Sequence, residues 1–96
     1  MAWAAWSGEL AYRTLKYRAD PTVVLPKGAR ILSVGEQGGV PMLWAIVEDT
    51  APLVERRLLA IWTGMDLPNS DPGRYIGTIH SAGGLVTHYF DLGETR

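Results

Sequence analysis

A chain of 96 residues is long enough for one domain, and a domain of this size buries only about 60–65% of the surface that its unfolded form exposes. Hydrophobic residues make up 47% of the chain and charged residues 20%, which excludes a disordered or collagen-like protein. The absence of cysteine excludes disulfide bonds and thiolate metal sites. Because the formal net charge is −1, no global positive field attracts DNA or RNA, and we expect no non-specific nucleic acid binding.

The first eight residues are apolar, but they lack a basic region and are too short for a signal sequence. No later apolar run approaches the roughly 20 residues that cross a bilayer. We therefore expect a cytoplasmic protein that makes no contact with membranes. With no disulfide framework, its small size favours a homo-oligomer.

Short runs of β-branched and aromatic residues alternate with turn residues along most of the chain. This spacing predicts an all-β fold, a small antiparallel β-sandwich or barrel of about six to seven short strands. We expect an N-terminal arm at residues 1–10, a single β domain at 11–91 and a tail at 92–96. The predicted strands cover residues 11–18, 22–25, 29–35, 42–47, 56–63, 74–80 and 85–90.

The centre of the chain, residues 41–63, is predicted to be a hairpin with one tryptophan in each arm, Trp44 and Trp62. Both faces of each arm carry apolar side chains, which predicts either a sandwich interior or a contact with a second subunit. A short helix over residues 52–60 is the alternative, because the apolar residues of this stretch also recur at helical spacing.

The segments between the predicted strands differ in what they suggest. Residues 64–73 are rich in glycine, proline and aspartate, which predicts a surface excursion. Gly77, inside a predicted strand, marks a bulge or a close approach by another backbone or a ligand. In the N-terminal arm, Trp3 and Trp6 are expected to cover the core or a subunit contact rather than to stack on a ligand.

Several motifs stand in a distinctive order along the chain: LPKGARILSV at 25–34, LWA at 43–45, YIGT at 75–78, and then GG and V-x-H-x-F up to residue 90. In this order they resemble a widespread family of small phage and prophage proteins described only as a domain of unknown function. The chain departs from that family in the arm before Tyr12 and at Met65-Asp66, where the family has a histidine. The resemblance implies a phage origin and brings no catalytic residues with it.

Residues typical of catalysis do not form a recognisable constellation. No serine lies in a nucleophile elbow, and Asp66 and Asp71 are explained by turn chemistry, so we expect no enzyme and no cofactor. His80 and His88 are expected to face each other across a hairpin turn, but without a fixed third ligand they predict no metal site. The glycine pairs 38–39 and 83–84 precede no helix, which favours hairpin turns over phosphate-binding loops.

One set of residues suits a nucleotide-like ligand, because arginine holds phosphate bidentately and tryptophan or tyrosine stacks on a base. The alternative is that these arginines protect strand edges and that the aromatic side chains belong to the core. The predicted ligand-binding residues are Arg56, Arg57, Trp44, Trp62, Arg74 and Tyr75.

The function expected from these features is binding rather than turnover. With the phage resemblance, the leading hypothesis is a protein that counters host defence by sequestering a nucleotide-derived immune signal, a small anion, in a pocket at a subunit interface. One alternative is a stoichiometric inhibitor of a host defence protein, like an anti-CRISPR protein, that uses the N-terminal tryptophans and the loop 64–73. A small phosphoesterase is the other.

Overall fold

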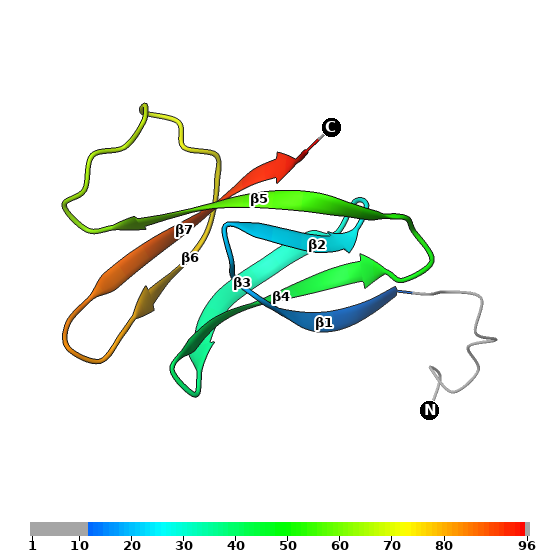
Figure 1. Cartoon of the computed structure of the whole chain (residues 1–96), viewed down its shortest axis with the longest axis horizontal. Helices are drawn as coiled ribbons and strands as arrows, with labels where there is room; N and C mark the ends of the chain where they lie inside the picture. The colour runs from blue at the N-terminus through cyan, green and yellow to red at the C-terminus, as the bar shows by residue number, and fades with distance from the viewer. Residues whose placement is uncertain (1–11, 96) are drawn as a thin grey trace.

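The computed structural model describes residues 12–95, and this part of the chain contains seven strands and no helix (Figure 1). The all-β prediction is confirmed, and residues 52–60 lie in and just before a strand, not in a helix. The predicted arm, with Trp3 and Trp6, lies outside the described residues. The strands are β1 (Tyr12–Arg18), β2 (Thr22–Pro26), β3 (Arg30–Gln37), β4 (Val40–Glu48), β5 (Leu53–Trp62), β6 (Arg74–His80) and β7 (Val86–Glu94).

The seven strands form two antiparallel sheets that face each other as a small sandwich. Sheet A has the strand order β1-β4-β3, and sheet B has the order β2-β5-β7-β6. The molecule is thin, with extents of 49 × 32 × 18 Å, so each sheet has one face toward the core and one toward solvent. None of the described residues forms a helix long and apolar enough to cross a membrane.

The predicted central hairpin is wrong, although both of its strands exist. β4 pairs with β1 and β3 in sheet A, whereas β5 pairs with β2 and β7 in sheet B. The turn after Glu48 therefore carries the chain from one sheet to the other. The inward residues of β4 and Leu58 of β5 belong to the same buried cluster, so both strands contribute to one core without backbone pairing between them.

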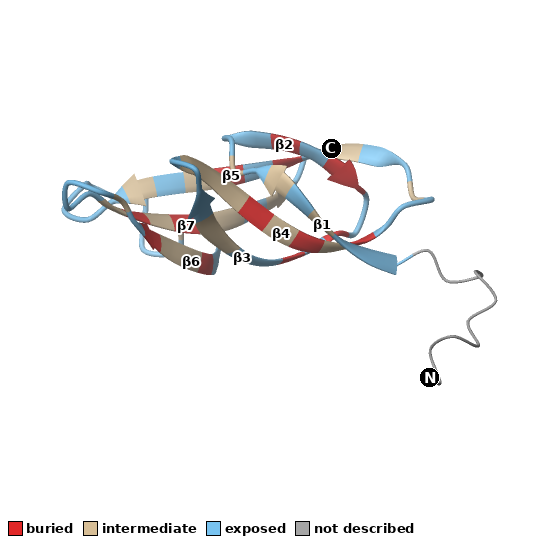
Figure 2. Cartoon of the chain, turned by 90° about the horizontal axis from the view of Figure 1, so that it is seen from below, coloured by how far each residue is buried: buried red, intermediate tan, exposed pale blue. Residues whose placement is uncertain are grey.

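The core follows the two-residue period of the strands. On β4, the inward residues Leu43, Ala45 and Val47 are fully buried, while the alternate residues are only partly covered (Figure 2). Sheet B contributes inward residues such as Val23 and Leu25 from β2. The complete buried apolar cluster is Val23, Leu25, Ala29, Ile31, Leu43, Ala45, Val47, Leu58, Ile76, Ile79 and Tyr89.

The last strand is longer than predicted. β7 continues to Glu94, and the N–H of Thr95 donates to the Glu55 carbonyl at 2.8 Å, so most of the predicted tail belongs to sheet B. A bulge allows this extension, because the register shifts opposite Arg57 and Leu58. Gly93 takes a positive φ of 97°, which a glycine adopts without strain.

Gly77 lies where β6 meets β3 of the other sheet. The pairing of β6 with β7 shifts between Tyr75 and Gly77, so the predicted bulge is confirmed. The nearest neighbour is a side chain rather than the backbone or ligand that was the alternative to a bulge, because a Cβ built on Gly77 would lie only 2.9 Å from Cγ2 of Val34. The absence of a side chain at Gly77 therefore lets the two sheets approach at this edge.

Replacing Gly77 by alanine tests this contact. We expect Gly77→Ala to destabilise the fold by roughly 1–3 kcal/mol, because the methyl group overlaps Val34 and the backbone has a φ of 157°. In a urea-unfolding double-mutant cycle, Val34→Ala should recover part of that loss by removing the overlapping methyl group. Additive effects of the two substitutions would contradict the contact.

Candidate functional site

The six predicted ligand-binding residues lie on different surfaces of the sandwich. Trp44 is on the outer face of sheet A, since it alternates with the buried residues of β4. Arg57 and Tyr75 share the outer face of sheet B. Trp62 ends β5 on the inward side and is 51% exposed, while Arg74 is exposed at the start of β6. Within the described chain, these side chains do not line one common cavity.

Arg56 points into the molecule and is bound by the chain's own groups. Its Nη1 donates to Oδ2 of Asp91 at 2.8 Å, in an ion pair whose side chains are 7% and 8% exposed. Its Nη2 donates to the Ala29 carbonyl at 2.6 Å and lies 3.5 Å from Oε2 of Glu94. The guanidinium thus joins β5 to β7 and to the turn between β2 and β3, and it is not presented to a ligand.

The carboxylates around Arg56 also hold backbone groups. The second oxygen of Asp91 accepts a hydrogen bond from the Gly93 N–H at 2.8 Å, which fixes the bulge in β7. Oε2 of Glu94 accepts the Gly28 N–H at 2.6 Å. This hydrogen bond and the charge of Arg56 keep the pKa of Glu94 below its ordinary value, although desolvation acts in the opposite direction. Together these contacts tie the β2–β3 turn to the end of the chain.

The outer face of sheet B brings two of the predicted residues onto one surface. Across the sheet, Leu59 of β5 lies opposite Phe90 of β7, which lies opposite Tyr75 of β6. The rings of Tyr75 and Phe90 meet edge to face, with centroids 5.8 Å apart. Arg57 lies two residues before Leu59 on β5 and faces the same side of the sheet. By strand geometry, the Cα atoms of Arg57 and Tyr75 are therefore roughly 12 Å apart.

A chain of hydrogen bonds crosses the same face beside the aromatic pair. The hydroxyl oxygen of Thr63 lies 2.7 Å from Nε2 of His88, and the Thr78 hydroxyl oxygen lies 3.0 Å from Nδ1. Thr78 in turn contacts the Tyr75 hydroxyl at 2.5 Å. Both ring nitrogens of His88 are therefore occupied, and the imidazole is fixed in orientation.

The sequence interpretation did not identify the two threonines in this series of hydrogen bonds. His88 was expected opposite His80, but β6 and β7 begin to pair at His80 and Val86, which places Thr78 opposite His88. This register is set by the turn between β6 and β7. The turn spans five residues, and the Ser81 N–H donates to the Leu85 carbonyl across it. Threonine alternating with apolar residues in the last strands was the only available signal, and it is common in ordinary strands.

A shallow hollow of about 220 Å³ lies next to His88 on this face. Its apolar walls come from β5, β7 and the start of the loop after β5, and its polar groups are Thr63 and His88. A hollow of this size is smaller than the roughly 300–1,000 Å³ typical of small-molecule sites. Its lining residues are Ile61, Trp62, Thr63, Gly64, Met65, Leu67, His88 and Phe90.

A second hollow, of about 230 Å³, lies at the turn between β1 and β2. It is mainly apolar, and its charged residue is Asp20, which disfavours an anion. Tyr89 forms part of its wall, and burial together with the charge of Glu36 raises the pKa of this tyrosine. The outer face of sheet B is therefore the better candidate for an anionic ligand.

No group of three or more histidine, aspartate or glutamate side chains able to hold a metal ion occurs among residues 12–95. The two histidines lie on the same face of neighbouring strands, but His88 is held by threonines rather than by a carboxylate. The chemistry that this face offers is hydrogen bonding, aromatic contact and one exposed guanidinium.

Comparison with known proteins identifies the family of this chain. The family model described as Domain of unknown function (DUF7352) matches residues 12–96, so the chain belongs to that family. No curated protein matches the sequence, and no solved structure matches it either. The matched region begins at the first residue of β1 and includes all seven strands.

Removing Arg56 tests its structural role. We expect Arg56→Ala to lower the free energy of unfolding by about 3–5 kcal/mol, because it leaves the buried carboxylate of Asp91 without its partner. The matched control is Arg57→Ala, which removes the same side chain from the exposed face and should cost about 0.5 kcal/mol or less. Equal losses in urea denaturation would show that Arg56 does not anchor the fold.

The lowered pKa of Glu94 predicts an acid-sensitive contribution to stability. Its folded-state pKa lies below the ordinary value of 4.5, so the stabilisation is present above that pH and is lost as the pH falls through the folded pKa. The urea midpoint of the native chain should therefore exceed that of Glu94→Gln at pH 7, and the two should converge in acid. A midpoint difference that does not change with pH would contradict this assignment.

Proposed function

We propose that this protein acts by binding, and that it holds a small anionic nucleotide-derived ligand on the outer face of sheet B. The observation that supports this proposal most is the grouping on one face of an exposed guanidinium, an edge-to-face aromatic pair and an oriented histidine. A guanidinium suits a phosphate group, whereas the ring of Tyr75 and the fixed imidazole of His88 offer surfaces that a base can stack on.

Arg57 is the proposed phosphate ligand. It is exposed, lies opposite Thr22 and Gly93, and makes no ion pair among the described residues. Glu55 takes the neighbouring outward position on β5 but is not bonded to Arg57. An uncompensated guanidinium at the surface is available for a bidentate contact with a phosphate group.

Tyr75 and His88 are the proposed contacts for the base. Tyr75 is 56% exposed although its ring contacts Phe90 edge to face, so much of the side chain remains open for stacking. The threonines that hold His88 keep its ring in one orientation at the wall of the hollow. A planar base fits a hollow of about 220 Å³, whereas the sugar and phosphates would extend along the sheet toward Arg57.

A second copy of the chain would close this site. Of the ten large hydrophobic residues that are exposed among residues 12–95, eight lie on sheet B and its connections, which is more than isolated surface residues explain. A single chain leaves the ligand half covered, and a second chain would bury both the ligand and these side chains. The eight residues are Val24, Leu53, Trp62, Met65, Leu67, Tyr75, Leu85 and Leu92.

In this proposal the ligand is an immune signalling nucleotide of a bacterial host, and the protein is encoded by a phage and acts in the host cytoplasm. The phage origin and the immune role of the ligand depend on the resemblance of the sequence to small phage proteins. Sequestration requires tight binding without chemistry, which agrees with a site that offers contacts but no activated nucleophile.

The same apolar surface supports one alternative, a stoichiometric inhibitor that binds a host defence protein. Leu53 and Val24 are 68% and 52% exposed on neighbouring strands, at a distance from His88. A protein partner would bury them without any need for the polar groups around the hollow.

Ligand uptake distinguishes these functions. The protein is incubated with nucleotide second messengers and ADP-ribose derivatives, separated from free ligand and heat-denatured, and the released compounds are identified by mass spectrometry. Release of an unchanged nucleotide would support sequestration, whereas release of a cleaved product would indicate a phosphoesterase. Absence of uptake would favour the protein inhibitor.

Variants locate the site in the same assay. Arg57→Ala and Tyr75→Ala should each reduce uptake at least about tenfold, since each removes a phosphate or stacking contact. Arg13→Ala is the matched control, because it removes an arginine from the exposed Arg13–Asp49 pair on the other sheet. Full uptake by both site variants would place the ligand elsewhere.

A further inference from the structure

The outer face of sheet A is a second surface with a definite chemical character. We call it the basic face, and we define it by Lys16, Arg18 and Arg30 around Trp44. All four side chains belong to outward positions, because the alternate residues of β1, β3 and β4 pack into the core. This surface lies on the opposite side of the sandwich from the proposed nucleotide site.

The register of sheet A places a central apolar strand between two polar ones. Lys16 of β1 and Ser33 of β3 flank Trp44, and Arg30 lies opposite Ile46 in the next outward row. Arg18 lies opposite Met42 on the other side of Trp44. Outward residues along a strand are about 7 Å apart and neighbouring strands about 5 Å apart, so all three cations surround one tryptophan.

Carboxylates cancel only part of the positive charge of the basic face. Lys16 donates from Nζ to the neutral amide oxygen of Gln37 at 2.8 Å, across the central strand. Arg18 lies 3.6 Å from Asp20 in a solvent-exposed pair, and Arg30 makes no ion pair among the described residues. Among the outward-facing residues of β1, β3 and β4, the acidic residue is Glu48, at the end of β4.

The indole ring of Trp44 lies close to Gly35 on the neighbouring strand β3. A Cβ built on Gly35 would approach the indole ring to 3.3 Å, so the ring extends over the backbone of β3. Such a ring is supported from below by the sheet, and Trp44 remains partly exposed. An indole supported in this way is a stacking platform for a planar group.

We infer that the basic face binds single-stranded nucleic acid, with Trp44 stacking on a base and the three cations contacting the phosphates. The complementary charge identifies the occupant as a polyanion, and the tryptophan at the centre identifies one with unpaired bases. The net charge of −1, from which the sequence predicts no non-specific nucleic acid binding, averages over both sides of the molecule, so this inference departs from that expectation for the basic face alone. An acidic peptide or an anionic membrane would use the cations but not the stacking surface.

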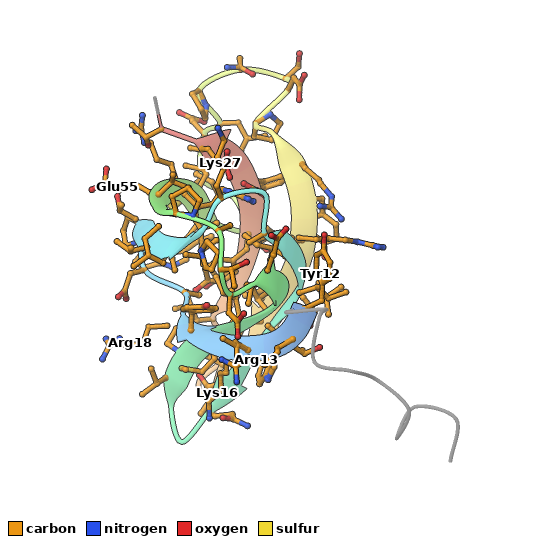
Figure 3. All side chains as sticks on the ribbon, turned by 90° about the vertical axis from the view of Figure 1, so that its right-hand side faces the viewer. Tyr12, Arg13, Lys16, Arg18, Lys27 and Glu55 are labelled. Atoms are coloured by element: carbon orange, nitrogen blue, oxygen red, sulfur yellow. The ribbon has the colours of Figure 1, made fainter. Side chains whose placement is uncertain are left out.

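Fluorescence anisotropy with a labelled oligothymidylate of about 12 nucleotides tests the inference, using the full chain at 50 mM salt. Trp44→Leu should weaken binding about tenfold, and Lys16→Gln with Arg30→Gln should weaken it further. Lys27→Gln is the matched control, since Lys27 lies on the far side of the molecule from Lys16 (Figure 3). For three phosphate contacts, raising the salt to 200 mM should weaken binding about 20-fold.

Each outcome bears on the inference. Weaker binding by Trp44→Leu and by the cation variants, with Lys27→Gln unchanged, would support it. Absence of binding at 50 mM salt would overturn it, and so would equal competition by polyglutamate or by phosphatidylserine vesicles, since neither can stack. If Trp44→Leu fails to fold by circular dichroism, the exposed cation variants decide, because unchanged affinity in them would overturn the inference.

Discussion

The buried ion pair of Arg56 and Asp91 is the constraint on which this sandwich depends. With its core only two sheets thick, the protein places a charged pair where a larger protein would place apolar side chains. The pair connects β5 to β7, and the carbonyl of Ala29 adds the turn between β2 and β3. A single guanidinium thus joins segments that are distant in sequence.

This arrangement also separates the two arginines of β5 by role. Arg56 and Arg57 are neighbours in sequence, but the two-residue period of a strand sends their side chains to opposite faces. The inward arginine is occupied by three groups of its own chain, whereas the outward one is exposed. Of these adjacent identical residues, one therefore stabilises the fold and the other is open to solvent, and a pairing of both on one ligand is incompatible with the strand.

Local patterns in the sequence predicted the fold class and most strand positions, because alternation and turn residues act over a few residues. They did not predict that β4 and β5 belong to different sheets, since an apolar strand looks the same whether it pairs with its neighbour or faces it across a core. Two residues of the proposed site were already candidates in the sequence, and their binding role stays a prediction. Arg57 and Tyr75 were identified by type, but the contacts of His88 depend on a register that only the structure gives.

The separation of β4 and β5 has a consequence for how the chain folds. The pairs β3–β4 and β6–β7 are hairpins made of adjacent segments. In contrast, β1 pairs with β4, and Thr22 of β2 pairs with Arg57 of β5, so these partners are distant in sequence. These non-local pairings close long loops, which places folding in the millisecond-to-second range typical of β-sandwiches. During synthesis on the ribosome, β1 emerges before β4 exists, and β2 must remain unpaired until β5 follows in the second half of the chain.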